Sequence, residues 1–360
     1  MHLNGALLMK YYKKGINNMA KETLEETLAP FIRPVTEEDR GKLPVYSYSK
    51  LDLFESCNYK YKLRYIDKNY DSSEAIHLYL GTLCHKICEI KGRIKAEGRE
   101  VTKDDYSYLE KVLEEGIEEE TDKGSELIKG LKDIKKMYLE DYYTADNASG
   151  MNYDEKIKLF MNKVIHEEME EPEWNVLHNE FSFEFVFCYE SEAGEKKEAI
   201  IHGFIDRVDR NENGDFRVVD YKTSKKSYDP KKMATPLQQC IYGMALFNEY
   251  GKVPVEYRYD FIFIDEKQQA CTKGYLKRAL KKLTKLLNKI DELEETGVYC
   301  PNPTPLCYWC FAGDSPNADD KFRGLCPYRS LWTPDKKTFD VLNRFEEDVK
   351  PPKTDRKLIF

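Results

Sequence analysis

The sequence lacks any long hydrophobic run, any internal repeat and any low-complexity linker. Because a membrane-spanning helix needs roughly 20 consecutive apolar residues, we expect no membrane association. The first apolar stretch, residues 5–9, is too short for the core of a secretory signal peptide, which predicts a cytoplasmic protein. No G-x-x-x-x-G-K-S/T phosphate loop occurs, so we do not expect this chain to be an ATP-driven motor.

The composition is that of a globular protein. Of 360 residues, 41% are hydrophobic and 34% are charged, enough for one large domain or two modest ones with an ample core. The net charge of −8 gives no global support for nucleic-acid binding, but local charge decides that question. Acidic residues gather in residues 109–122, most simply as a solvated helix face. Residues 273–289 have the pattern of a basic amphipathic helix, whose polar face could add a phosphate contact.

Ten cysteines are present, and without export they favour metal or thiol chemistry over a disulfide framework. Cys307, Cys310 and Cys326 crowd in a Pro-rich segment near the C-terminus, and the first two are spaced closely enough to bind one centre. A closed site needs a fourth thiolate, for which Cys57 is the candidate and Cys300 the rival. Four cysteines suit either zinc or an iron–sulfur cluster.

The hydrophobic period predicts an α/β core. Helices are expected over residues 46–66, 76–96, 102–121, 124–145, 153–170, 233–249 and 273–296, the first capped by Ser47 or Ser49. Strands are expected over residues 180–190, 199–211, 215–223 and 255–264. The expected organisation is a flexible lead-in over 1–44, a main domain over 45–332 with a helical insertion at 100–175 and a cysteine segment at 300–328, and a tail over 333–360.

Two aspartates and a lysine sit at the centre of a predicted hairpin. A two-residue Asn213-Gly214 turn would point Asp206 and Asp220 to opposite faces. A three-residue loop with Gly214 in the left-handed position would instead set Asp206 opposite Asp220, with Lys222 on the same face. We choose the second register because only it gathers the three polar groups. The alternative interpretation is a surface hairpin with ordinary charges.

Other polar residues fall where they could join this group. Gly81, His85 and Glu89 share one face of the predicted helix 76–96, with Gly81 allowing another element to come close. His85 is either a metal ligand or a histidine of the core. Glu180 either helps to hold a metal or caps a strand edge. Gln238 and Tyr242, one helical turn apart, either act on substrate and water or line a helix–sheet border; both lie on the helix after the Asp220 strand.

These residues support metal-assisted hydrolysis of a phosphodiester. Asp206 and Asp220 would bind Mg²⁺ or Mn²⁺ through oxygen, and His85 as an added ligand favours Mn²⁺. Lys222 would position water and offset developing charge at the scissile phosphate.

The order of these motifs resembles one family. Its features are Ser47-x-Ser49-Lys-Leu followed by Cys57-x-Tyr-Lys-Tyr, Gly81-x-x-x-His85, Gly203-x-Ile-Asp206-Arg, Asp220-Tyr-Lys222, Gln238-x-x-x-Tyr242, and Cys307-x-x-Cys310 with Cys326-Pro. Residues 46–330 are similar to the RecB-like branch of the PD-(D/E)XK nucleases, and most closely to its iron–sulfur members, the AddB nuclease domain and CRISPR-associated exonucleases. A departure is the long gap from Phe311 to Leu325 before the last cysteine.

The resemblance implies a restriction-endonuclease-like fold, a mixed central sheet flanked by helices with a cysteine-ligated C-terminal staple. It implies that His85, Asp206 and Asp220 bind Mg²⁺ or Mn²⁺ and that Lys222 is catalytic, with Gln238 and Tyr242 in the same site. It implies a 4Fe-4S cluster on the four cysteines Cys57, Cys307, Cys310 and Cys326. The implied activity is exonuclease cleavage of single-stranded DNA or duplex ends in recombination or repair, with any helicase a separate partner.

Three other functions compete with this one. A non-catalytic DNA-binding or assembly subunit could keep the fold, although binding alone does not require Lys222. A nuclease could be stapled by zinc instead of iron and sulfur. An unrelated α/β protein could carry incidental charges on the hairpin.

Overall fold

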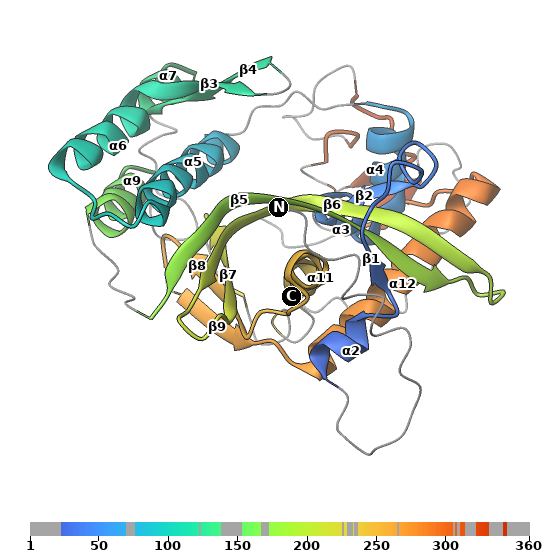
Figure 1. Ribbon diagram of the computed structural model, residues 1–360. Helices are drawn as coiled ribbons and strands as arrows, with labels where there is room; N and C mark the ends of the chain where they lie inside the picture. Colours follow the sequence, from blue (N-terminus) through green and yellow to red (C-terminus); the bar gives the residue numbers. More distant parts are fainter. Residues whose placement is uncertain are drawn as a thin grey trace. The chain divides into compact units, whose positions relative to one another are not determined.

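The computed structural model describes residues 23–69, 76–121, 124–137, 153–166, 173–224, 227–228, 233, 237–264, 266–304, 307, 310–313, 322–330 and 341–343 (Figure 1). The chain forms two compact units. The first contains residues up to Tyr48 and Ala75–Lys285, and the second contains Ser49–Glu74 and Leu286–Phe360. No described helix is both long enough and apolar enough to cross a membrane.

A mixed seven-stranded sheet is the centre of the first unit. Its strands are β1 (Ile32–Arg33), β2 (Val45–Ser47), β5 (Asn175–Glu190), β6 (Lys196–Arg210), β7 (Phe216–Lys222), β8 (Glu256–Phe261) and β9 (Glu266–Ala270). They run in the order β1-β5-β6-β7-β8-β9, with β2 also paired to β6. The β2–β6 and β7–β8 pairs are parallel and the others antiparallel. The strands predicted from hydrophobic alternation are therefore confirmed, with β5 beginning earlier than expected.

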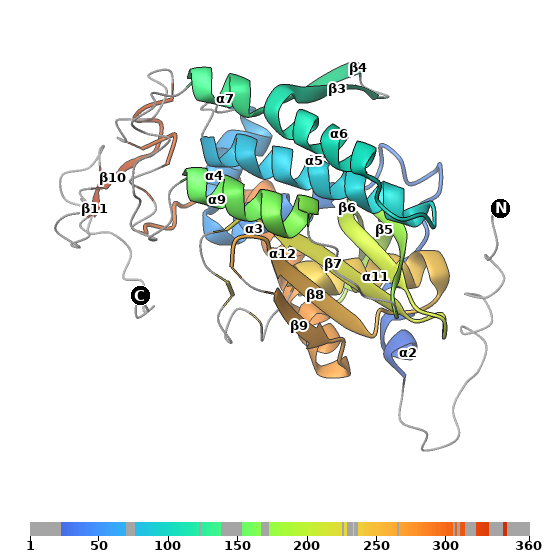
Figure 2. The same ribbon diagram turned by 90° about the vertical axis from the view of Figure 1, so that its left-hand side faces the viewer.

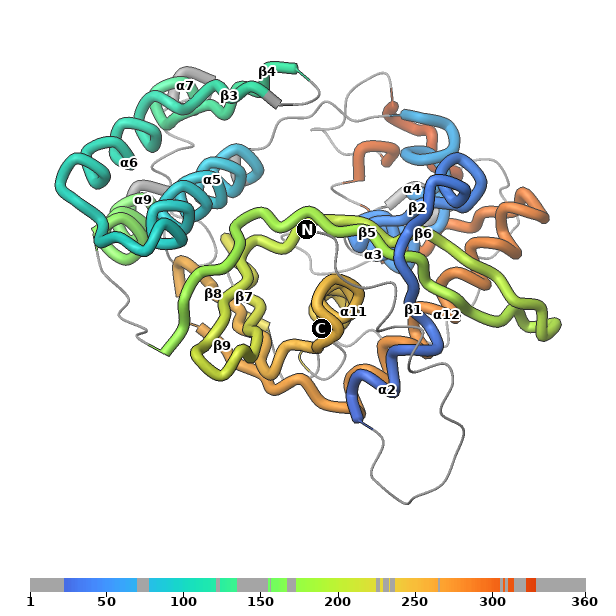
Figure 3. The backbone as a smooth tube through the Cα atoms, in the orientation of Figure 1, coloured from blue at the N-terminus to red at the C-terminus, as the bar shows by residue number. Residues whose placement is uncertain are grey.

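Helices cover both faces of this sheet. They are α5 (Ile76–Ala96), α6 (Lys103–Glu115), α7 (Leu131–Met137), α9 (Tyr153–Phe160), the π-helix η2 (Met161–His166) and α11 (Leu237–Tyr250). The sheet curves around α11 on its concave face, while α5 crosses the opposite face (Figures 1 and 3). Figure 2 shows α6 and α9 stacked beside α5 on that outer side. A core joins α5 and its neighbours to the sheet through Val219 and Tyr221 of β7.

The insertion is not wholly helical, which corrects the helices predicted over residues 102–121 and 124–145. Strands β3 (Gly116–Thr121) and β4 (Gly124–Lys129) form an antiparallel hairpin instead. Gly116 has φ of 81°, and a Cβ there would lie 2.2 Å from the Ile128 carbonyl oxygen. The glycine therefore ends α6 and begins the hairpin. Residues 138–145 of the second predicted helix lie outside the described residues.

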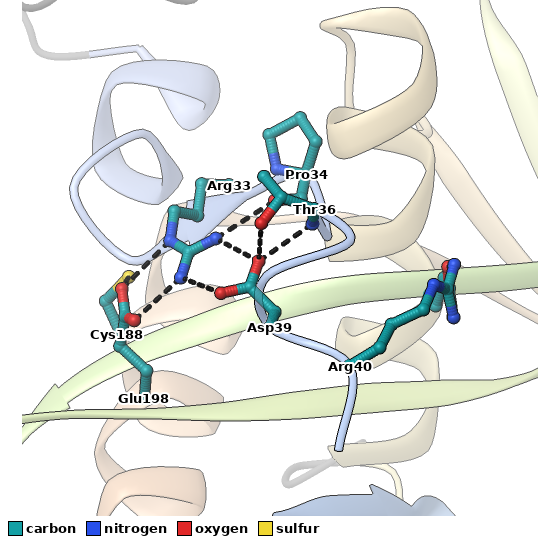
Figure 4. A network of polar contacts seen from close by, with 8 residues as sticks. Arg33, Pro34, Thr36, Asp39, Arg40, Cys188 and Glu198 are labelled. Carbon is teal, nitrogen blue, oxygen red and sulfur yellow. Dashed lines mark hydrogen bonds and ion pairs between the residues drawn. The ribbon is translucent and has the colours of Figure 1, made fainter. Parts of the chain in front are cut away.

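The lead-in predicted over residues 1–44 also contains regular structure. Helix α2 (Leu24–Leu28) begins with a capping box in which Thr23 and Glu26 exchange hydrogen bonds. Strand β1 then pairs with β5, and Arg33 at its end hydrogen-bonds both Asp39 and Glu198 (Figure 4). These contacts make residues 24–39 part of the first unit.

The second unit contains most of the predicted 46–66 helix. That segment is divided into α3 (Tyr48–Ser56), α4 (Asn58–Tyr61) and the π-helix η1 (Lys62–Ile66), and Cys57 lies at the break. Short strands β10 (Tyr328–Ser330) and β11 (Val341–Asn343) pair with each other. The long helix α12 (Lys273–Thr296), which begins in the first unit, matches its predicted bounds and buries Leu276, Leu280, Leu283 and Leu287.

Candidate active site

The candidate site lies where strand β6 has no strand beside it on one edge. On that edge β2 pairs with β6 around Tyr46↔Ile201. The next partner, β7, pairs with β6 only from Arg207 onwards. Residues 203–206 therefore lie between the two partners. This is the segment that carries Asp206, so its side chain is placed in a gap of the sheet rather than on a continuous face.

The hairpin between β6 and β7 has the predicted three-residue loop. Asn211 and Asp215 close it, with the Asn211 amide donating to the Asp215 carbonyl oxygen at 3.1 Å. Gly214 has φ of 77°, the left-handed conformation that the loop requires. The pair Arg207↔Val219 then sets the next residues, Asp206 and Asp220, opposite each other. The register chosen from the sequence is confirmed.

The Asp206 side chain accepts a hydrogen bond from β7 at the point where β6 has no paired strand. Its Oδ2 accepts a hydrogen bond from the Tyr221 backbone amide at 2.7 Å. Its Oδ1 lies 3.7 Å from Nδ1 of His85, which projects from α5. Burial lowers the pKa of His85, but the hydrogen bond and charge of Asp206 raise it more, so the net shift is upward. A cation that binds this imidazole must therefore compete with a proton.

Asp220 and Lys222 form a buried ion pair beside Asp206. The Lys222 Nζ lies 2.6 Å from Asp220 Oδ2, and the Asp220 side chain is 1% exposed. Burial alone would lower the pKa of Lys222, but the charge of Asp220 raises it above its ordinary value. This shift favours the charged form of Lys222.

Gln238 and Tyr242 continue from this pair along α11. Lys222 Nζ donates to Gln238 Oε1 at 3.3 Å, and Gln238 Nε2 donates to the Tyr242 hydroxyl at 2.8 Å. The structure thus brings these two predicted residues into contact with the ion pair. Their chain of hydrogen bonds fixes the direction in which the lysine points.

Two predictions for helix α5 have different outcomes. A Cβ on Gly81 would lie 3.3 Å from the Thr223 hydroxyl, so the expected close approach occurs just after β7. Glu89 instead lies in a separate buried cluster, where its carboxylate is 2.6 Å from Lys86 Nζ and is also paired with Arg93. Glu89 is therefore occupied by neighbouring cations and is not part of the metal cluster.

Glu180 joins the site although the sequence left its role open. One ligand atom each from His85, Glu180 and Asp206 lie within 4.8 Å of one another, the set among the described residues that could hold a metal ion. Asp220 is outside this close set, beside Lys222. Burial, followed by the charge of Asp206, raises the pKa of Glu180 to about 7. Glu180 stands opposite Asp206 in the β5–β6 register, between Asn179↔Arg207 and Phe181↔Ile205.

In the second unit the cysteines predicted to bind a metal are all half-buried, whereas Cys300 is exposed. Cys310 and Cys326 pack against a small cluster centred on Phe311 and Phe322. Burial raises the pKa of Cys307, and the charges of Cys310 and Cys57 add to that shift, so these thiols are neighbours.

The sequence profile of the PD-(D/E)XK nuclease superfamily matches residues 45–315. The chain belongs to the PD-(D/E)XK nuclease superfamily. Its mixed sheet flanked by helices is accordingly the restriction-endonuclease-like fold. The matched region contains every residue of the candidate site.

Known relatives of this PD-(D/E)XK chain are much longer. It is 24% identical over 268 residues to a subunit of the ATP-dependent helicase/deoxyribonuclease of Clostridium perfringens strain SM101, and equally to its counterpart from strain 13. The match covers 67% of this chain and 20% of each relative. The chain therefore spans about a fifth of the length of the curated relatives that it matches.

The donor set fits the divalent metal that PD-(D/E)XK nucleases use. Carboxylate oxygens suit Mg²⁺ and Mn²⁺, and an imidazole nitrogen favours Mn²⁺ between them. Three ligand atoms converge from three elements, His85 from α5, Glu180 from β5 and Asp206 from β6. The excess negative charge of the two carboxylates is what a bound cation would neutralise.

Proposed function

We propose that this protein is a metal-dependent deoxyribonuclease that hydrolyses phosphodiester bonds from DNA ends. The observation that carries the proposal is the gap beside β6, where Asp206 and His85 adjoin the Asp220–Lys222 ion pair. A binding module needs neither a buried lysine paired to an aspartate nor a converging set of metal donors. Metal-assisted hydrolysis of a phosphodiester can use both, the donors to hold the cation and the lysine to stabilise developing charge.

His85 and Asp206, with Asp220 beside them, would hold Mg²⁺ or Mn²⁺. The cation would supply an activated water and charge neutralisation at the phosphate. Asp206 is kept in place by its bond from the Tyr221 amide, so this ligand is oriented by the backbone of β7. The pKa of His85 lies above its ordinary value, and we therefore expect metal binding to weaken as the pH falls.

Lys222 would act as a fixed cation at the reacting phosphate. Its charge is maintained by Asp220, and its direction is fixed by Gln238. Because the lysine is largely buried, its charge is screened by little water and stabilises developing negative charge effectively. Gln238 and Tyr242 are positioning residues for the lysine in this proposal.

The relatives suggest the substrate and the partner. They are named as subunits of an ATP-dependent helicase/deoxyribonuclease, which supports DNA as the polymer and a helicase as the partner protein. We propose that any ATP-driven unwinding comes from that partner. Cleavage of single-stranded DNA by this chain should then be independent of ATP.

The test is cleavage of end-labelled single-stranded and duplex DNA with Mg²⁺ or Mn²⁺. Anaerobically purified wild type should degrade linear substrates from an end and leave closed circular DNA intact. Asp220→Asn should abolish cleavage, because it removes the counter-charge of Lys222. Glu212→Gln, an exposed carboxylate in the loop of the same hairpin, is the matched control and should cleave like the wild type.

Three results would contradict the proposal, the last of them only its exonuclease part. Equal cleavage by the wild type and Asp220→Asn would mean that a contaminant or another site acts. DNA binding without cleavage, with either metal and with the wild-type chain, would favour the non-catalytic subunit. Cleavage of circular DNA would retain the nuclease but replace exonuclease by endonuclease action.

We further propose that Cys57, Cys307, Cys310 and Cys326 hold a 4Fe-4S cluster rather than zinc. Cys307 and Cys310 are separated by two residues, and the order of the cysteines along the chain is similar to that of the iron–sulfur members of the superfamily. Four cysteine thiolates are the usual ligands of such a cluster. Backbone amides of Lys60 and Thr304 already donate to the sulfurs of Cys57 and Cys307, at 3.5 and 3.3 Å.

A further inference from the structure

Strand β5 changes its alternation of faces just before the candidate site. In a regular strand, residues three apart point to opposite faces. His178 and Phe181 nevertheless both contact Tyr250 of α11, with ring centroids 6.1 and 6.4 Å away. Asn179, between them, lies against α5 on the other face. One residue in this stretch must therefore break the alternation.

That residue is Glu180. Its φ is 48°, the left-handed conformation that side-chain-bearing residues rarely adopt. Glutamate gains no local hydrogen bond that would compensate for this conformation, unlike asparagine or aspartate. Such backbone strain persists only where surrounding contacts hold it, and it is common at functional sites. The strained residue here is also the one whose carboxylate meets His85 and Asp206.

The residue before Glu180 fits closely against α5. A Cβ on Gly92 of α5 would lie 1.9 Å from Asn179 Oδ1 and 2.7 Å from its Cγ, so only glycine leaves room for this side chain. Asn179 Oδ1 is buried and has no hydrogen-bonding partner among the described residues. Steric fit against the helix, rather than hydrogen bonding of Oδ1, therefore fixes where Asn179 lies.

We propose that Glu180 is a ligand of the catalytic metal, and that Asn179, seated against Gly92, is a positioning residue that keeps Glu180 in its left-handed conformation. The inference rests on the proposed metal-dependent function. In this arrangement, the contact between β5 and α5 turns the Glu180 carboxylate out of the regular alternation of the strand and into the gap beside β6. Glu180 would then join His85 and Asp206 as a ligand of the metal, with Asp220 beside them.

The test is a titration of the protein with Mn²⁺ in the absence of DNA. Binding is measured by calorimetry and by the electron paramagnetic resonance spectrum of bound Mn²⁺. Glu180→Gln should weaken Mn²⁺ binding at least about tenfold, the range seen when groups around a metal site are lost. Glu195→Gln, an exposed glutamate in the β5–β6 turn, is the matched control and should bind like the wild type. Asp206→Asn should abolish binding.

The positioning half of the inference has its own variants. Gly92→Ala should displace Asn179 and weaken Mn²⁺ binding by about 10-fold to 100-fold. The double variant Gly92→Ala/Asn179→Ala removes the overlapping atoms and should recover most of the affinity. Gly274→Ala controls for the change of residue type, because the added Cβ on this helix glycine would meet the end of Arg278 at 3.4 Å and Thr272 Oγ1 at 4.0 Å, both ordinary contacts.

The outcomes separate the inference from the proposed function. Unchanged Mn²⁺ affinity in Glu180→Gln, with binding lost in Asp206→Asn, would refute Glu180 as a ligand. A normal affinity in Gly92→Ala would refute the positioning role of Asn179. If the wild type does not bind Mn²⁺, both the inference and the metal dependence are wrong. If it binds Mn²⁺ but cleaves no DNA, only the proposed function fails and the titration still decides the inference.

Discussion

The lysine of the candidate site is held as a cation by its surroundings. Lys222 is paired to a buried Asp220 at 2.6 Å, and its Nζ also donates to Gln238. An aspartate this deeply buried would otherwise favour its neutral form, and burial does raise its pKa. The charge of Lys222 opposes that rise, and the charge of Asp220 raises the pKa of Lys222, so each residue favours the charged form of the other.

Replacing the lysine should remove catalysis and leave metal binding. Lys222→Met keeps the length of the side chain but not its charge, so cleavage should fall by about 10²–10³, the effect of losing one group that stabilises transition-state charge. Mn²⁺ affinity, measured by calorimetry, should stay within about twofold because the close donor set does not include Lys222. Lys252→Met, whose Nζ donates to the Gly214 carbonyl oxygen, is the control. Full activity in Lys222→Met would contradict the assigned role.

The raised pKa of Glu180 predicts a pH-dependent stability in the metal-free protein. The folded-state pKa of about 7 exceeds the ordinary value of 4.5, so the folded chain holds a proton that the unfolded chain has released. The free energy of unfolding should then fall as the pH rises from about 4.5 to about 7. Thermal unfolding in a chelator should show this slope in the wild type, and Glu180→Gln should reduce it. Identical slopes would contradict the prediction.

At the scale of elements, β1 is attached to the sheet by a network of charges. Arg33 hydrogen-bonds both oxygens of Asp39 and both oxygens of Glu198, while Thr36 donates twice to Asp39 (Figure 4). The hydrogen bond from Arg33 is the largest cause that holds the pKa of Asp39 well below its ordinary value. The network joins the loop after β1 to the end of β6 that is far from the hairpin.

Removal of this arginine should destabilise the fold without touching the site. Arg33→Ala is expected to lower the free energy of unfolding by about 1–2 kcal/mol, because charge-assisted hydrogen bonds are lost from a partly exposed network. Arg40→Ala, which breaks more exposed pairs with Glu37 and Glu184, should destabilise the fold less. Denaturant unfolding measures both. An equal loss of unfolding free energy in the two variants would mean that the Arg33 network stabilises the fold no more than exposed ion pairs do.

The β3–β4 hairpin was wrongly predicted as helix. Its acidic residues Glu118, Glu119 and Glu120 follow an amphipathic helix directly and have no alternation of apolar residues. Glu119 is accounted for only in three dimensions, where Lys86 of α5 lies 2.5 Å from its carboxylate. Local composition favours a continued helix, whereas Gly116 and the contact with Lys86 of α5 favour the strand.

At the scale of the whole molecule, the second unit is built from two stretches far apart in sequence, with Cys57 in the first and Cys307, Cys310 and Cys326 in the second. Anaerobically purified protein is expected to be brown and to contain four irons and four sulfides per chain, as a 4Fe-4S cluster requires. Cys57→Ala should lose the visible absorbance and the iron, and it should lower the temperature at which the second unit unfolds. Cys300→Ala, the exposed rival, should keep both. Stoichiometric zinc with no iron would contradict the cluster.

The sequence by itself determined the order of the elements and most of the chemistry. Period-two alternation marked the strands, and the leucine spacing fixed α12. The turn residues allowed two loop lengths, and the three-residue loop that the structure has was chosen because it gathers Asp206, Asp220 and Lys222. The loop then placed Asp206 opposite Asp220, because strand register follows from turn length. The motifs around these residues also carried the resemblance to the PD-(D/E)XK nucleases, which the family match confirms.

Only the tertiary structure decided which polar groups converge. Glu180 meets His85 and Asp206 because a left-handed residue breaks the alternation of β5, and no local pattern announces that break. Glu89, equally well placed on the face of α5, is instead paired with Lys86 and Arg93. Register and period are local properties of the chain, whereas the partner that neutralises a given charge is fixed by packing between elements far apart in sequence.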